Sequence, residues 1–388
     1  MRIVKVRALR YALITGFLFS LHLALVSYAN STFASQLFGE NAVGPLFSIA
    51  AFISLMALLF WAPRKIAING SLLFVALLLL ISIFALTGLS QATFSIISAA
   101  LFILYLSHNS LILYGLDMMV EHATDNNANT GKIRGIYLTV LNMAWMLALL
   151  GTGTILEHGG FNLLYLIGAI LVFLSLTTLY KAGTMLNTHK LKPVRVGLNF
   201  RRIFRSKNLS SIFLVNFLLQ TFYIVMVIYT PLYLANTIGF SWGDISIIFV
   251  VMLSPFVLLQ YPLGRIADMR FGEKEILIFG LIVMGLATLM ITAIDTPSIW
   301  IWATTLLVTR IGAATVEVMS DSYFFKHVGE EDTGLVSVYR AIAPLAGVII
   351  PILGALIIGA FGYLSLFSCL GVLCLLAIIP AARIKDTR

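Results

Sequence analysis

The sequence predicts an all-α integral membrane protein with roughly twelve transmembrane helices in two similar six-helix halves. Three observations support this fold class: the apolar composition, the placement of the basic residues and an internal repeat. Of the 388 residues, 60% are hydrophobic and only 11% are charged, whereas a soluble domain carries about 25% charged residues. Because so few charges cannot cover a water-soluble surface, we expect lipid to surround most of the chain.

The apolar runs are long enough to cross a bilayer, which takes roughly 20 predominantly apolar residues. They follow one another with short connections and take up nearly the whole chain, so no sizeable soluble domain is expected. The predicted spans are 10–32, 41–61, 69–89, 93–117, 134–156, 161–180, 209–235, 244–264, 275–294, 298–321, 337–358 and 361–381.

Basic residues occupy only one alternating set of the segments between these spans. Apart from Arg310, every Lys and Arg lies near a terminus or in or beside an even-numbered connection. The other connections carry acidic residues instead, namely Glu40, Glu157, Asp244 and Asp295. Positive charge accumulates on the cytoplasmic side of membrane proteins. We therefore expect an even number of spans, both termini in the cytoplasm and a place in the plasma (inner) membrane.

A long basic stretch divides the chain near its middle. Residues 181–208 hold eight Lys or Arg and no acid. This composition predicts an N-terminal six-helix half over 1–181, a basic cytoplasmic central loop over 182–208 and a C-terminal six-helix half over 209–388.

The two halves repeat each other. An acidic pair four residues apart, Asp117 and Glu121, closes the fourth span, and a second pair, Glu317 and Asp321, closes the tenth span 200 residues later. Further along, Tyr137 corresponds to Tyr339 and Gly160 to Gly362, at an offset of 202. Two parallel repeats of six spans are typical of a large class of secondary transporters.

The connection between spans eight and nine carries the most specific motif. It reads Gly264-Arg-Ile-Ala-Asp-Met-Arg-Phe-Gly-Glu-Lys274, which resembles the cytoplasmic signature of the major facilitator superfamily, Gly-x-x-x-Asp-Arg-x-Gly-Arg-Lys. This copy has Met269 and Glu273 at positions that are basic in the family, and Gly272 falls one place late. With the twelve spans, the central loop and the repeat, the resemblance covers the whole chain. No substrate-defined subfamily is identified.

The resemblance implies a cytoplasmic gate. In the family, the motif aspartate accepts hydrogen bonds at a helix N-terminus of the other half, and a motif arginine reaches an acid at the end of span ten. Alternatively, the basic loop only anchors the chain on the cytoplasmic side. The residues that we expect in the gate are Gly264, Asp268, Arg270, Gly272, Glu121 and Asp321.

The resemblance also implies that spans one, four, seven and ten line a central substrate cavity. These spans hold most of the polar residues that lie inside the predicted membrane segments. The expected cavity residues are His22, Asn109, Tyr114, Asp117, Asn216, Gln220, Tyr223, Arg310 and Glu317.

Arg310 is the only basic residue placed deep within a span. A charge at that depth costs about 2.5–3.5 kcal/mol on insertion scales, so it must face a partner or water. Arg310 therefore binds an anionic or polar solute, pairs with Asp117 or Glu317 in a charge switch, or forms a static ion pair that holds helices together. We expect an acidic or tyrosine partner, with Asp117, Glu317 and Tyr114 as candidates.

The sequence lacks the motifs that mark several functional classes. The sequence contains no Gly-x-x-x-x-Gly-Lys-Ser/Thr loop for ATP, no Cys/His cluster with metal-ligand spacing and no nucleophile elbow. We therefore expect no enzyme, no cofactor and no nucleic-acid partner, but a monomeric secondary transporter for a small solute, a symporter or antiporter using protons or sodium. The alternative is a non-transporting receptor or assembly factor on the same fold. The sequence does not reveal the substrate.

Overall fold

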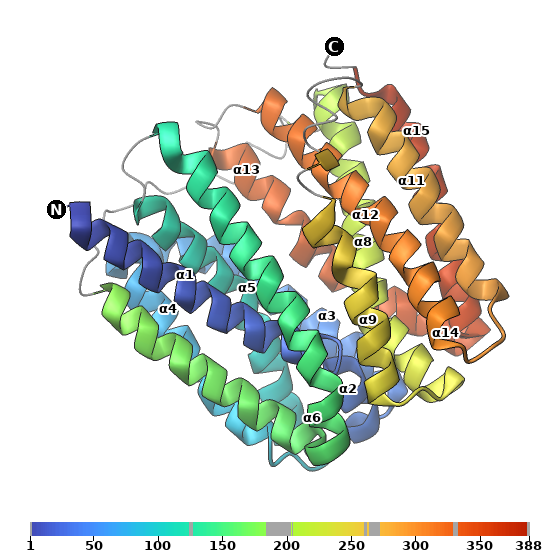
Figure 1. Cartoon of the computed structure of the whole chain (residues 1–388), viewed down its shortest axis with the longest axis horizontal. Helices are drawn as coiled ribbons and strands as arrows, with labels where there is room; N and C mark the ends of the chain where they lie inside the picture. The colour runs from blue at the N-terminus through green and yellow to red at the C-terminus, as the bar shows by residue number, and fades with distance from the viewer. Residues whose placement is uncertain are drawn as a thin grey trace. The chain divides into compact units, whose positions relative to one another are not determined.

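The computed structural model describes residues 2–123, 127–183, 203, 205–259, 262–263, 272–328 and 333–385. Over these ranges the regular elements are all helical, which confirms the all-α class. The chain separates into two compact units, unit 1 at Met1–Pro193 and unit 2 at Val194–Arg388, which Figure 1 colours from blue to green and from green to red. The predicted central loop, 182–208, falls mostly outside the described residues.

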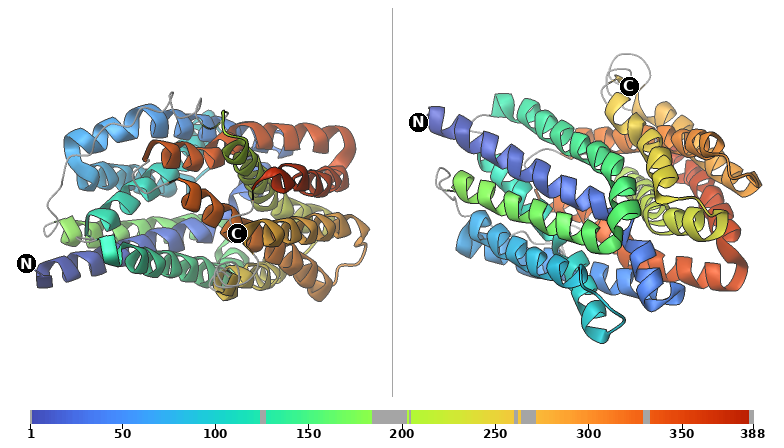
Figure 2. Two further views of the ribbon diagram at one scale, coloured as in Figure 1. Left: turned by 90° about the horizontal axis from the view of Figure 1, so that it is seen from above. Right: turned by 60° about the horizontal axis from the view of Figure 1, so that its bottom comes forward.

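Unit 1 consists of long helices packed side by side. Helix α1 lies along α6, α4 packs against both α5 and α6, and α3 packs against α5 (Figures 1 and 2). A π-helical turn, Ala57–Trp61, joins α3 to α4. The elements are α1 (Arg2–Ser27), α2 (Asn30–Phe38), α3 (Glu40–Met56), α4 (Ala62–Leu89), α5 (Ile96–Ala123) and α6 (Asn127–Gly183).

Unit 2 repeats this kind of packing. Helix α12 packs against α11, α9 and α8, while α14 packs against α8 and α11. A capping box starts α9, because the Ser241 hydroxyl accepts from the Asp244 amide and the Asp244 carboxylate accepts from the Ser241 amide. The elements are α8 (Lys207–Leu232), α9 (Trp242–Leu258), α11 (Glu273–Met290), α12 (Ile299–His327), α13 (Thr333–Arg340), α14 (Ile342–Leu376) and α15 (Ile378–Arg383).

The expected count of twelve helices is not confirmed. Within the described ranges, nine helices are long and apolar enough to cross a membrane, judged by length and composition. Two of these candidates, Thr139–Lys181 and Val338–Arg383, are 43 and 46 residues long, about twice what one crossing needs. One further apolar helix, Trp242–Leu258, is shorter.

Each of the two long candidates bends at a glycine. Gly160 inside α6 has φ 61° and ψ −164°, and Gly362 inside α14 has φ 81° and ψ 174°, so neither position is helical. A Cβ at either position would meet nothing within 4 Å, so the backbone conformation and not the available space calls for glycine. Two expected spans are therefore joined at each of these two glycines, which occupy equivalent places in the internal repeat.

The first expected span, 10–32, is interrupted. Helix α1 ends at Ser27, and α2 begins at Asn30 after a short turn. The Ala29 amide bonds the Val26 carbonyl at 3.0 Å, three residues back, which tightens the last turn of α1. The sequence has neither glycine nor proline at this point, so the usual signals for a helix break are missing.

The packing of α12 on α11 depends on two small residues. A Cβ at Gly312 would lie 2.5 Å from the Met284 amide nitrogen and 2.8 Å from the Gly280 carbonyl oxygen. Only glycine permits this approach, as is common where membrane helices pack closely. The contact fixes the position of α12, which carries Arg310 and Glu317. Large apolar side chains such as Ile96 and Phe361 are exposed on the outside, as expected for a surface facing lipid.

Candidate functional site

Helix α12 carries three charged residues, Arg310, Glu317 and Asp321, along one face. Glu317 follows Arg310 by seven residues and Asp321 follows it by eleven. At 100° per residue, both steps return to within about 20° of the Arg310 direction. Arg310 is 2% exposed, and Glu317 and Asp321 are partly buried. The charged stripe therefore points into the protein and not into lipid.

Two aromatic rings of α8 surround the Arg310 guanidinium. Its central carbon lies 5.3 Å from the centroid of Phe222 and 5.4 Å from the centroid of Tyr223. Such cation–π contacts contribute about 0.5–2 kcal/mol each, and more when water is excluded. Arginine does not lose its proton in proteins, so its charge must be stabilised by its surroundings.

Tyr223 also joins this cation to the acidic part of the stripe. Its hydroxyl donates a hydrogen bond to Glu317 Oε2 at 3.1 Å, and its ring lies 6.1 Å from that of Phe256 on α9. Arg310, Tyr223 and Glu317 are three of the expected cavity residues, and unit 2 brings them together. We call these three residues the α8–α12 cluster.

The other expected residues of α8 continue this polar face. Gln220 Nε2 donates to Asn216 Oδ1 at 3.1 Å, and the Asn216 side chain hydrogen-bonds with Tyr339. The Tyr339 hydroxyl donates to Asp321 Oδ1 at 2.9 Å, and the Tyr339 ring stacks on Phe324 with centroids 4.0 Å apart. Tyr339 was not among the expected site residues, although its match to Tyr137 in the repeat singled it out.

In unit 1, the expected cavity residues His22 and Asn109 lie on either side of Tyr105. His22 Nδ1 is 2.9 Å from the Phe19 carbonyl, and Nε2 is 2.9 Å from the Tyr105 hydroxyl. Because a carbonyl only accepts, Nδ1 carries the hydrogen in the neutral ring, and the Tyr105 hydroxyl donates to Nε2. The Asn109 amide hydrogen-bonds with this hydroxyl, and Asn109 Oδ1 has no partner within the described part of the chain.

His108 forms a second buried contact in unit 1. Its Nε2 lies 2.6 Å from the Ser82 hydroxyl on α4, and its Nδ1 bonds the Leu104 carbonyl. This contact ties α5 to α4, as the His22–Tyr105 contact ties α1 to α5. The remaining expected cavity residues of this unit, Tyr114 and Asp117, lie partly buried on the last turns of α5.

The expected gate is only partly visible. Gly264, Asp268 and Arg270 lie outside the described residues, as does the side chain of Glu121. Gly272 precedes α11 and is buried, with φ 73° and ψ 175°. This conformation favours glycine, which gives the late glycine of the motif a structural role.

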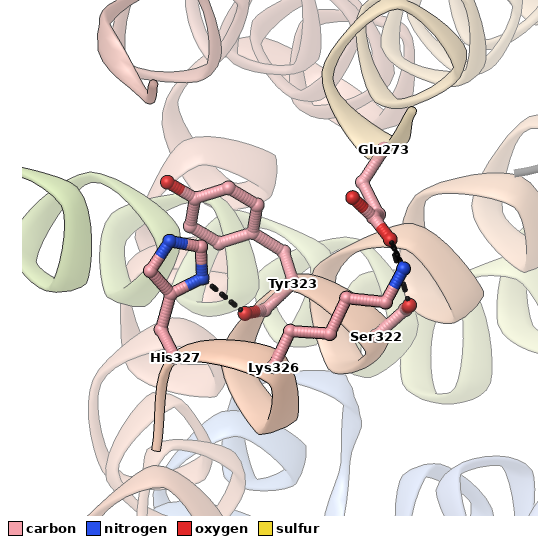
Figure 3. Close-up of polar contacts among 5 residues, drawn as sticks. All are labelled: Glu273, Ser322, Tyr323, Lys326 and His327. Atoms are coloured by element: carbon pink, nitrogen blue, oxygen red, sulfur yellow. Dashed lines mark hydrogen bonds and ion pairs between the residues drawn. The ribbon is translucent and has the colours of Figure 1, made fainter. Parts of the chain in front are cut away.

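An ion pair between a buried acid and an exposed lysine follows directly after this glycine. Glu273 is 0% exposed, and Lys326 Nζ lies 2.5 Å from its Oε1. The Ser322 hydroxyl donates to the same oxygen at 3.1 Å. Figure 3 shows these contacts between α11 and the last turns of α12. Sequence reasoning noted Glu273 only as a departure from the family motif and did not identify Lys326 as its partner.

The end of α12 also holds the C-terminal segment. The Tyr323 hydroxyl donates to the Lys385 carbonyl at 3.0 Å, and the Tyr323 ring stacks on His327 at 4.1 Å (Figure 3). The Lys385 amide donates to the Asn208 side chain at 3.3 Å. Across the described residues, no group of three or more His, Cys, Asp or Glu is placed to hold a metal ion.

Comparison with known proteins supports the resemblance seen in the motif. Residues 212–387 match the Major Facilitator Superfamily. Among solved structures, an auto-inhibited POT family peptide transporter superposes with a TM-score of 0.76 at 12% identity, covering 98% of each chain. The POT family transporter PepTSo superposes with a TM-score of 0.72 at 11% identity, covering 97% of each chain.

No curated protein matches the sequence of this chain. At the identities of the two solved structures, the likeness establishes the fold and not the substrate. The expected resemblance to the major facilitator superfamily is confirmed: the C-terminal half matches its sequence pattern, and the whole chain has the fold that POT family transporters share.

Proposed function

We propose that this protein is a secondary active transporter that moves a small solute across the membrane by alternating access, coupled to an ion gradient. The proposal is supported by the fold, by the match to the superfamily and by the apolar helices. It is carried chiefly by one observation, the α8–α12 cluster of Arg310, Tyr223 and Glu317.

The cluster favours a functional role, because burying a charged side chain within a membrane segment costs free energy. Arg310 is 2% exposed inside a helix with the length and composition of a span. Charged side chains at such depth mark solute and ion pathways in most membrane proteins. A purely structural helix contact could be made by apolar side chains without this cost. We therefore assign Arg310 to solute binding, with Glu317 and Tyr223 as its neighbours in the same site.

We propose the same role for the polar residues that surround this cluster and for their counterparts in unit 1. In unit 2 these are Asn216 and Gln220, which continue the polar face of α8. In unit 1 they are His22, Asn109, Tyr114 and Asp117. Gly264, Asp268, Arg270, Gly272, Glu121 and Asp321 remain our proposal for the cytoplasmic gate.

We further propose that the chain crosses the membrane twelve times, with both termini in the cytoplasm. We propose the plasma (inner) membrane as its location. Nine candidate spans lie in the described ranges. Dividing α6 at Gly160 and α14 at Gly362 adds two crossings, and we count the shorter apolar helix Trp242–Leu258 as the twelfth. An even number agrees with the basic residues near both termini.

The test is solute binding and uptake by the purified full-length protein. A thermal-shift screen should include peptides, because a solved relative of this fold is a peptide transporter, and also amino acids, sugars, carboxylates and lipophilic cations. A solute that binds only the folded state raises its melting temperature. Hits are then tested for uptake and for exchange of labelled against unlabelled solute in proteoliposomes.

The expected result is at least one solute that stabilises the protein, exchanges across the vesicle membrane and accumulates under an imposed ion gradient. Exchange without accumulation would contradict coupling. A solute that binds but never exchanges would contradict transport and would instead indicate the alternative, a membrane receptor on this fold.

A further inference from the structure

The short helix α13 is separated from α14 by a single turn residue. Helix α13 ends at Arg340 and α14 begins at Ile342, so Ala341 lies between them. The Ala341 amide bonds the Val338 carbonyl at 3.1 Å, three residues back, as at the end of a helix. Pro344 has no N–H group to offer the carbonyl four residues before it. The backbone between α13 and α14 therefore has fewer hydrogen bonds than a continuous helix, and it can bend there.

One hydroxyl group joins α13 to two other helices of unit 2. The Tyr339 hydroxyl donates to Asp321 Oδ1 on α12 at 2.9 Å. It also hydrogen-bonds with the side chains of Asn216 on α8 and Ser320 on α12. A single polar atom of α13 thus contacts both helices that carry the α8–α12 cluster.

The ionised carboxylate of Asp321 fixes the direction of the bonds that follow. A carboxylate only accepts, so the hydroxyl hydrogen of Tyr339 points to Asp321. The hydroxyl oxygen then accepts from the amide nitrogen of Asn216, which leaves Asn216 Oδ1 to accept from Gln220 Nε2 at 3.1 Å. The attachment of α13 therefore continues into the side chains of α8 that we assign to solute binding.

The ring of Tyr339 is held separately from its hydroxyl. It stacks on Phe324 of α12 with centroids 4.0 Å apart and meets Phe213 of α8 edge-on at 5.5 Å. Leu335 and Val338, four and one residues earlier on α13, are also buried. These apolar contacts would remain without the hydroxyl, so substitution can separate the polar part of the attachment from the apolar part.

The polar part of the attachment is one that water can replace. Hydrogen bonds of a hydroxyl can be exchanged for bonds to water with a small net change in free energy. The contact of α12 with α11 has no such alternative, because Gly312 packs directly on the backbone of Met284. We therefore expect α11 and α12 to stay together and α13 to be the part that separates.

We propose that α13 is a hinged segment of the cytoplasmic gate, fastened by the Tyr339 hydroxyl to Asp321 and Asn216. Asn216 is 5% exposed, so water or a solute reaches its side chain only when a neighbour moves away. When the bonds of Tyr339 break, α13 turns at Ala341 and the polar face of α8 becomes accessible. The fastening is argued from contacts inside unit 2, whereas its part in admitting a solute rests on the proposed function.

The test is hydrogen–deuterium exchange of the purified full-length protein, measured by mass spectrometry in peptides that cover 333–341. Tyr339→Phe keeps the ring and removes the hydroxyl. We expect exchange in this segment to become about tenfold faster, because the bonds that are lost oppose its local opening. Exchange in α11 and in unit 1 should be unchanged. Unchanged exchange over 333–341 would mean that Tyr339 only packs, and it would overturn the proposal.

Two substitutions of Asp321 test the acceptor. Asparagine still offers a carbonyl oxygen to the Tyr339 hydroxyl, so Asp321→Asn should change exchange over 333–341 much less than Tyr339→Phe does. Asp321→Leu removes the acceptor and should accelerate exchange as much as Tyr339→Phe. If Asp321→Leu does not fold, Asn216→Leu removes the other partner and should also accelerate exchange. Equal exchange in the leucine variant and in the unsubstituted protein would overturn the proposal.

Tyr363→Phe is the matched control. Tyr363 lies on α14, and its hydroxyl is buried without a hydrogen-bond partner within the described residues. Loss of this hydroxyl should leave exchange over 333–341 unchanged. An acceleration equal to that of Tyr339→Phe would show that the effect is not specific to the bonds with Asp321 and Asn216, and it would overturn the proposal.

Gln220→Cys, in a background that lacks Cys369 and Cys374, reports whether the polar face of α8 opens. Its reaction with a hydrophilic maleimide should be accelerated by Tyr339→Phe by a factor similar to that seen in exchange, because both reactions proceed through the open state. Faster exchange without faster labelling would overturn the role of α13 in access. Neither measurement needs a transported solute, so a failed solute screen would contradict the proposed function and leave the fastening of α13 standing.

Discussion

The Tyr223 hydroxyl donates to Glu317 Oε2 at 3.1 Å, although the two residues are 94 positions apart in the chain. The ring of the same tyrosine lies 5.4 Å from the Arg310 guanidinium carbon. One side chain of α8 thus contacts both the cation and an acid of α12. This arrangement allows the contribution of the hydroxyl to be separated from that of the ring by substitution.

Tyr223→Phe should remove the hydrogen bond to Glu317 and keep the aromatic face toward Arg310. We expect a loss of about 1–3 kcal/mol in the free energy of unfolding, because a charged or polar acceptor loses its donor. Tyr223→Leu should cost roughly 0.5–2 kcal/mol more, since it also removes the cation–π contact. Equilibrium unfolding in mixed micelles measures both changes.

The matched control is Tyr363→Phe. The Tyr363 hydroxyl is buried and has no hydrogen-bond partner within the described residues, so its removal should be neutral or stabilising. If Tyr363→Phe costs as much as Tyr223→Phe, the bond to Glu317 contributes nothing specific.

Arg310→Ala should abolish uptake of the solute identified by the screen, while Arg310→Lys should restore only part of it. Lysine keeps the charge but lacks the planar fork that binds carboxylates and stacks on aromatic rings. Initial uptake rates in proteoliposomes measure the effect. Val308→Ala, at a 40% exposed position on the same helix, should leave uptake nearly unchanged. Full uptake by the Arg310→Ala protein would mean that Arg310 is not part of the solute-binding site.

The ion pair Glu273–Lys326 should respond unequally to loss of its two members, because only Glu273 is buried. Lys326→Met removes the ammonium group that contacts the carboxylate of Glu273, which is 0% exposed. Glu273→Gln leaves an ammonium group on a side chain that is 44% exposed, which water can solvate. We expect the first change to destabilise the protein by a few kcal/mol and the second by less.

Thermal or chemical unfolding of both single variants and of the double variant measures this asymmetry and the coupling between the two residues. Lys207→Met, at an exposed position at the start of α8, controls for the loss of a surface lysine. Equal effects of Lys326→Met and Lys207→Met would mean that the pair is not stabilising.

The proposed topology predicts opposite labelling of two single cysteines, at Lys192 in the central loop and at Glu157 before the bend in α6. Both are introduced in a background that lacks Cys369 and Cys374. A membrane-impermeant maleimide added to intact cells should modify the cysteine at 157 only, and the cysteine at 192 should react after the membrane is opened. Labelling of both from the same side would contradict the twelve-crossing arrangement.

Asp268→Asn tests the proposed gate. The family resemblance assigns this aspartate to contacts that close the cytoplasmic side, so its neutralisation should make cysteines at cavity positions such as Asn216 more reactive from that side. Expression should stay close to normal, because the residue lies in a polar connection. Unchanged reactivity of these cysteines would mean that the loop serves only as a positively charged anchor on the cytoplasmic side.

Features that depend on local pattern follow from the amino-acid sequence alone. Long apolar runs specify helices and their approximate limits, because a segment in lipid must hydrogen-bond its backbone N–H and C=O groups within itself. The distribution of Lys and Arg predicts sidedness, and the seven-residue spacing of Arg310 and Glu317 places both on one face of α12. The internal repeat in the sequence shows that Gly160 and Gly362 are equivalent. It does not show that both adopt a non-helical backbone conformation.

Which side chains meet depends on how the helices pack against one another. Tyr223 with Glu317, and His22 with Tyr105, are 94 and 83 positions apart, and Lys326 and Glu273 are separated by 53. Such contacts depend on how each helix is rotated against its neighbour. An apolar helix gives little sign of this rotation, because lipid and protein neighbours are equally apolar. The end of helix α1 after Ser27 likewise has no nearby glycine or proline that would predict it, so it is evident only from the folded structure.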